Sequence, residues 1–122
     1  MSEIKTFKDL RTWNEAQCLV EEVYRIISMF PKSEERGLVD QMRRACISIP
    51  SNIAEGMGRG TAKELIQFLI IARGSVHELL SQLDTANRLQ FISTDDFTNL
   101  SERYSGLNAG INSHISQITK YK

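Results

Sequence analysis

The sequence predicts an all-α protein in which residues 1–122 form a single domain, an antiparallel up-down four-helix bundle. Apolar residues recur at spacings of three and four in four segments, and the breaks between them coincide with helix stop and start signals. No sustained alternation with a period of two appears, so strands are not expected. Four helices with short connections pack most simply as an up-down bundle.

The composition fits one globular domain. The chain is 41% hydrophobic and 25% charged, and its net charge is zero. This neutral balance argues against strong nonspecific binding to phosphate backbones. The N-terminus has no apolar leader, and no apolar run reaches the roughly 18 residues of a membrane span. Cys18 and Cys46 lie outside metal-binding spacings, so we expect reduced, packed thiols rather than a disulfide, and a cytoplasmic protein.

The first helix is expected over residues 8–29. Its core-facing residues are Leu10, Trp13, Val20, Tyr24 and Ile27. It ends before Pro31, because proline cannot continue a helix and biases the preceding residue toward extended geometry. Ser33 is then the expected N-cap of the second helix, with Glu34 and Glu35 in the first turn, where the helix dipole favours negative charge.

The second helix is expected over residues 34–57. Its core-facing residues are Leu38, Met42, Ala45, Ile49 and Ile53. The segment "GMGRG" at 56–60 closes it. We interpret this segment as a flexible turn, because a phosphate-binding loop would need a preceding strand and a Gly-Lys-Ser/Thr sequence.

The third and fourth helices carry the longest apolar stripes. Thr61 and Glu64 form a capping box at the start of the third helix, whose stripe runs through residue 86. The fourth begins at "STDD" (93–96) and its stripe continues to residue 118. Gly106 and Gly110 lie within it, and indicate either close approach of a neighbouring backbone or a tolerant surface helix.

Pro50 interrupts the second helix. It cannot donate to the carbonyl of Cys46, and its ring pushes against that carbonyl, which costs about 3 kcal/mol unless the helix bends or another donor replaces the amide. Three short polar side chains are the expected replacement donors: Ser48, Ser51 and Asn52. We predict one helix kinked near residues 46–50, with two shorter helices as the alternative.

A polar stripe follows the second helix opposite its apolar line. It consists of Arg44, Ser48, Asn52, Glu55 and Arg59. It is either a solvated face or, together with Arg43 and Lys63, a contact for a partner or a nucleic-acid backbone. Because Ser75 and Glu78 lie inside the third helix, we expect them to meet Arg44 and Asn52 across the bundle. The predicted structural network is therefore Ser48, Asn52, Glu55, Ser75 and Glu78.

The sequence lacks the patterns of an enzyme or a metal protein. His77 and His114 lie on different expected helices, and neither belongs to a Glu-x-x-His pair. No Gly-x-Ser-x-Gly elbow occurs. We therefore expect a noncatalytic protein without a metal or cofactor.

Second apolar lines on two helices predict self-association. They are Leu19, Val23, Ile26 and Phe30 in the first helix and Ile66 and Ile70 in the third. One bundle interior cannot readily bury both lines of a helix, and large exposed apolar patches usually mark an interface. A homo-oligomer is therefore preferred over a monomer with broad core faces.

Three segments resemble one known family. They are "FKDLRTWNEAQ" (7–17), "FPKSEERGLVDQMRRACISIPSNIAEGMGR" (30–59) and "ELIQFLIIARGSVHELLSQL" (64–83), and they are similar to the bacterial four-helix-bundle proteins of 23S rRNA intervening sequences. The resemblance implies a four-helix protomer in a closed homo-oligomer, most often a pentamer. It also implies relatives that act as accessory proteins of diversity-generating retroelements, where a basic ring contacts nucleic acid and reverse transcriptase. This chain differs from them in being charge-neutral.

Two functions follow. The first is a noncatalytic oligomer that binds RNA or a ribonucleoprotein partner through a basic rim of Arg43, Arg44, Arg59 and Lys63. The second is a protein scaffold or adaptor without nucleic-acid affinity. In the second, the arginines pair with Glu35, Asp40 and Glu55 within or between protomers. The resemblance favours the first function, and the neutral charge favours the second.

Overall fold

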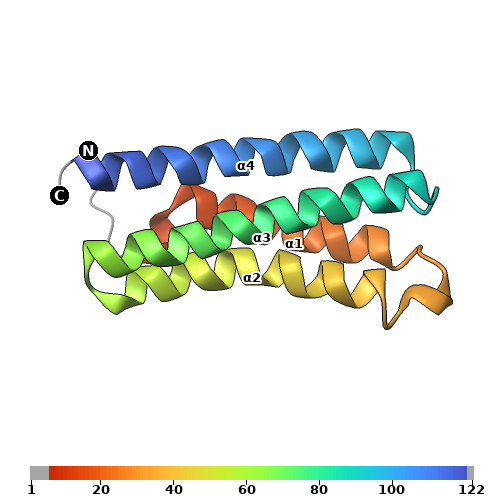
Figure 1. The fold of residues 1–122 in the computed structure, drawn as a ribbon, viewed down its shortest axis with the longest axis horizontal. Coiled ribbons are helices and arrows are strands. Elements are labelled where there is room, and N and C mark those ends of the chain that lie inside the picture. The colour runs from red at the N-terminus through yellow and green to blue at the C-terminus, as the bar shows by residue number, and fades with distance from the viewer. Residues whose placement is uncertain (1–5, 121–122) are drawn as a thin grey trace.

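The computed structural model describes residues 6–120, which form four α-helices and two short 3-10 helices and contain no strand. The 3-10 helices are η1 (Phe7–Asp9) and η2 (Lys32–Glu34). The α-helices are α1 (Arg11–Ile27), α2 (Leu38–Arg59), α3 (Ala62–Arg88) and α4 (Thr94–Lys120). The predicted all-α four-helix bundle is confirmed. The chain reverses direction at each connection between α-helices (Figure 1).

Each helix packs on its neighbour in chain order, and α1 also meets α4, so the four surround one core. The predicted core line of α2 is confirmed, since all five of its residues are buried. The largest side chains with almost no exposure come from all four helices: Leu19, Val23, Ile26, Met42, Ile49, Ile53, Leu69, Leu79, Leu83, Leu100, Tyr104 and Ile111.

The predicted inner face of α1 is confirmed except at Tyr24, since Leu10 and Ile27 are buried and Trp13 and Val20 are partly buried against the core. Leu19, Val23 and Ile26, expected to form an additional apolar line for self-association, are also buried in the core. Tyr24, expected inside, is 41% exposed and lies beside the guanidinium of Arg43. Because α1 packs against both α2 and α4, most residues of both apolar lines are buried. Exposed apolar residues therefore argue for self-association on α3 but not on this line of α1.

The start of α2 also differs from the prediction. Ser33 lies within η2, and α2 begins at Leu38, whose N–H donates to the side chain of Glu34 at 3.4 Å. Because Pro31 starts a tight 3-10 turn, the α-helix is delayed by one turn. Glu34, not Ser33, is the side chain that caps the incoming helix.

The helix α2 continues through Pro50 as a single element. The structure therefore contains one helix here rather than two, and a bend of its axis stays a prediction. The expected compensation at Cys46 is wrong. Asn52 Nδ2 donates to the carbonyl of Ser48 at 2.7 Å, and the hydroxyl of Ser48 lies 2.8 Å from that of Ser75. Neither Ser48 nor Asn52 therefore donates to the carbonyl of Cys46, which Pro50 leaves without its usual N–H donor.

The glycines of "GMGRG" do not form a loop, because α2 extends through Arg59. Only Gly60 lies beyond the helix, with a left-handed φ of 88° that ends it. Gly56 is buried where α2 meets α3. A Cβ on Gly56 would lie 2.8 Å from the Cβ of Phe68. The missing side chain therefore permits close packing of the two helices.

The start of α3 follows the prediction in part. The Thr61 hydroxyl accepts from the N–H of Glu64 at 3.2 Å, as a capping residue should. The Glu64 carboxylate, however, accepts from that same hydroxyl at 3.0 Å instead of reaching the backbone N–H of Thr61. The α3 helix ends with Gln90 at a φ of 62° and a hydrogen bond from the N–H of Phe91 to the carbonyl of Ala86, which is a Schellman motif.

Both cysteines are free thiols. Cys46 is buried, and burial raises the pKa of its thiol to about 11. Cys18 is exposed, so the expectation that both thiols are packed is wrong for this residue. Among the described residues, no helix combines the length and hydropathy needed to cross a membrane.

We expect Gly56→Ala to destabilise the fold by about 1–3 kcal/mol, because α2 and α3 must separate to admit the new methyl group. Gly58→Ala is the matched control, since Gly58 is helical and no side chain or neighbouring helix lies within 4 Å of its Cβ position. This change should stabilise the helix by about 0.5–1 kcal/mol. Urea unfolding followed by circular dichroism measures the change in stability of both variants. Equal changes for the two substitutions would contradict the close packing.

Candidate functional site

The predicted basic rim is divided and largely neutralised. Arg43 pairs with Glu35 at 3.0 Å, Arg44 with Asp40 at 3.1 Å, and Arg59 with Glu55 at 3.0 Å. Fifteen residues of helix separate Arg44 from Arg59, a distance of roughly 22 Å. Lys63 lies near Arg59, exposed at the start of α3. These groups form two separate clusters, in which the three arginines are paired with carboxylates, rather than one continuous basic surface.

The predicted polar network forms around two serines. The hydroxyls of Ser48 and Ser75 lie 2.8 Å apart across the α2–α3 contact. Asn52 Nδ2 donates to both the carbonyl and the hydroxyl of Ser48, at 2.7 and 2.9 Å. The 2.8 Å separation of the two hydroxyls shows that even these short side chains span the gap between the helices here.

Two members of the predicted network lie elsewhere. Glu55 binds Arg59 at the outer surface. Glu78 is exposed and does not meet Arg44, which is occupied by Asp40 one turn earlier on its own helix. The network therefore joins Ser48, Asn52 and Ser75 only, and its position between helices makes it structural.

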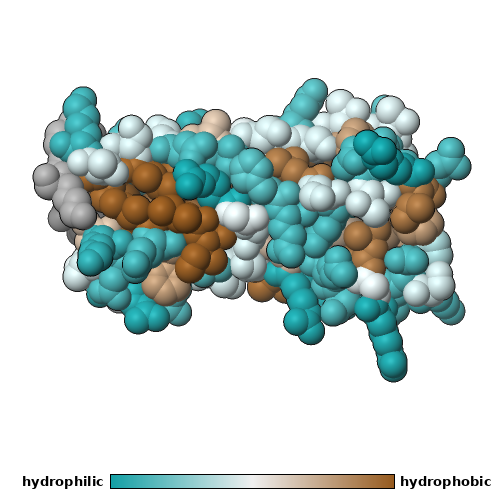
Figure 2. Space-filling model, in the orientation of Figure 1, coloured by the Kyte–Doolittle hydropathy of each residue, from teal (hydrophilic) through white to brown (hydrophobic). Residues whose placement is uncertain are grey.

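An apolar patch covers the N-terminal half of α3. Ile70 and Ile71 are 44% and 49% exposed, and Gln67 and Phe68 complete a shallow depression beside them. Figure 2 shows apolar side chains gathered over this part of the molecule. We call Gln67, Phe68, Ile70 and Ile71 the α3 face. The apolar spacing of the sequence predicts Ile70 on an outer line of this helix but does not predict the exposure of Ile71.

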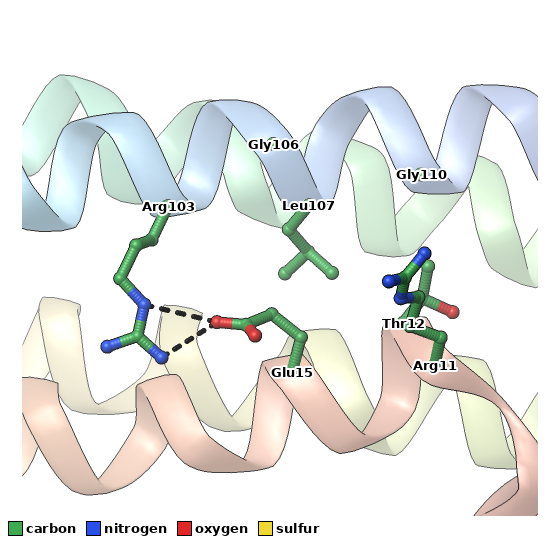
Figure 3. Close-up of a pocket in the computed structure, with 7 residues that line it drawn as sticks. All are labelled: Arg11, Thr12, Glu15, Arg103, Gly106, Leu107 and Gly110. Atoms are coloured by element: carbon green, nitrogen blue, oxygen red, sulfur yellow. Dashed lines mark hydrogen bonds and ion pairs between the residues drawn. The ribbon is translucent and has the colours of Figure 1, made fainter.

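A groove of about 390 Å³ runs between α1 and α4, the neighbouring helices in loosest contact. Its lining residues are Arg11, Thr12, Glu15, Arg103, Gly106, Leu107 and Gly110. Figure 3 shows Arg103 and Leu107 pointing from α4 toward α1, with Arg103 bound to Glu15. The Arg103 Nη2 to Glu15 Oε1 distance is 2.8 Å. This pair joins residues distant in the sequence, and no local pattern predicts it.

The two glycines of α4 contribute to this groove in different ways. A Cβ on Gly110 would lie 3.0 Å from Thr12 Cγ2, so α1 approaches closely there. No atom lies within 4 Å of the Cβ position of Gly106. The alternative of close approach therefore applies to Gly110, whereas Gly106 leaves an opening in the surface.

The described side chains were also compared with the requirements of a metal site. Within residues 6–120, no group of three or more His, Cys, Asp or Glu side chains could hold a metal ion. His77 is exposed, and burial lowers the pKa of His114.

Comparison with known proteins identifies the family. A family model described as 23S rRNA-intervening sequence protein matches residues 8–113. The chain belongs to this family. Comparison with curated proteins found no match.

The chain is also similar to a solved structure. This is a protein with unknown function from the S23 ribosomal protein family of Bacteroides thetaiotaomicron VPI-5482, with a TM-score of 0.72 and 21% sequence identity. The match covers 85% of this chain and 97% of that chain. At this identity the likeness supports the four-helix fold.

The Ser48–Ser75 contact should be measurable by a double-mutant cycle. We expect Ser48→Ala and Ser75→Ala each to destabilise the protein by about 1 kcal/mol, with a coupling of about 0.5–1.5 kcal/mol between them. Ser51→Ala is the control, because Ser51 is exposed on the same helix and should change stability by less than about 0.5 kcal/mol. Additive single effects in denaturant unfolding would show that the two hydroxyls do not interact.

Proposed function

We propose that this protein is a noncatalytic homo-oligomeric scaffold that associates through the α3 face. The exposure of Ile70 and Ile71 carries the proposal. Two adjacent isoleucines, each nearly half exposed beside Phe68, leave apolar area in water that a second protein surface would cover. A closed oligomer would bury this face in every copy. The family resemblance favours a pentamer.

The charges favour a scaffold over a phosphate-binding rim. Arg43, Arg44 and Arg59 each have a carboxylate partner within the chain, the arrangement expected of an adaptor without nucleic-acid affinity. A phosphate would have to compete with a carboxylate at each of these arginines. The even balance of charge removes the long-range attraction that brings basic proteins to nucleic acids.

RNA binding is the second candidate function. It is supported by the description of the family, which refers to an insertion in 23S rRNA, and by Lys63, which lies exposed near Arg59. Ion pairs at the surface contribute only about 0–1 kcal/mol each, so a polyanion could displace the carboxylates. The binding residues in this case would be Arg43, Arg44, Arg59 and Lys63.

The proposed scaffold function predicts that the protein assembles in a concentration-dependent way and that Ile70→Glu disrupts this assembly. Light scattering after size exclusion should give the wild type a mass of about five times the 13.9 kDa of one chain. The Ile70→Glu variant should elute as a single chain, because a carboxylate in a buried apolar contact loses its hydration. Ile47→Glu is the control, since Ile47 is 42% exposed on α2 and lies outside the α3 face. A wild type that stays monomeric at high concentration would contradict the scaffold.

A salt series separates the two candidate functions. We expect no shift of labelled structured RNA in electrophoresis at micromolar protein, because the arginines are paired within the chain. Binding that weakens steeply with salt would instead indicate contacts to phosphates. Arg44→Glu and Lys63→Glu would then locate these contacts, with Arg88→Glu, at the far end of α3, as the control.

A further inference from the structure

We draw no further inference here: the strongest candidate, the groove of about 390 Å³ between α1 and α4 that Arg11, Gly106 and Leu107 line, carries none, because nothing in the described part of the chain, residues 6–120, shows what covers it.

Discussion

The close contact between α2 and α3 is the constraint on which the rest of the structure depends. The absence of a Cβ at Gly56 lets these helices pack closely, and the φ of Gly60 turns the chain directly into α3. At this spacing the hydroxyls of Ser48 and Ser75 meet across the contact. The same packing turns Phe68 toward α2 and leaves Ile70 and Ile71 outside. The apolar α3 face therefore follows from the way the core is built.

The outer surface carries many ion pairs between side chains that are close in the sequence. Arginines of α2 and α3 bind carboxylates one turn away on the same helix, as Arg44 does with Asp40 and Arg88 with Asp84. Such pairs keep the surface hydrated and contribute little to stability. Two other arginines connect helices instead: Arg25 bridges to Asp96, whose pKa it lowers, and Arg103 bridges to Glu15. Both of these bridges cross the α1–α4 boundary, where apolar contact is weakest.

The sequence predicts the four helices and most of the core because the apolar spacing is long and regular on α2, α3 and α4. It fails on α1 for Tyr24, which is exposed, and for Leu19, Val23 and Ile26, which were expected at an interface and are buried because α1 packs against both α2 and α4. It also fails at Ser33, because a 3-10 turn after Pro31 is about as compatible with the local residues as a helix start. Of the site, Ile70 and the Ser48–Ser75 region were predictable from spacing. The groove was not, because Glu15 and Arg103 are brought together only by the tertiary fold.

Among the four described helices, α1 and α4 are neighbours that no loop joins, whereas every other neighbouring pair is connected by a short segment. Separation of these two helices therefore meets no resistance from a connecting segment, and the first structural fluctuations of the bundle should begin there. The backbone amides of α4 should exchange with solvent sooner than those of α2 and α3, which are held by a tight turn. A fluctuation of this kind would also allow the last helix of one molecule to take the corresponding place in another, the process known as domain swapping.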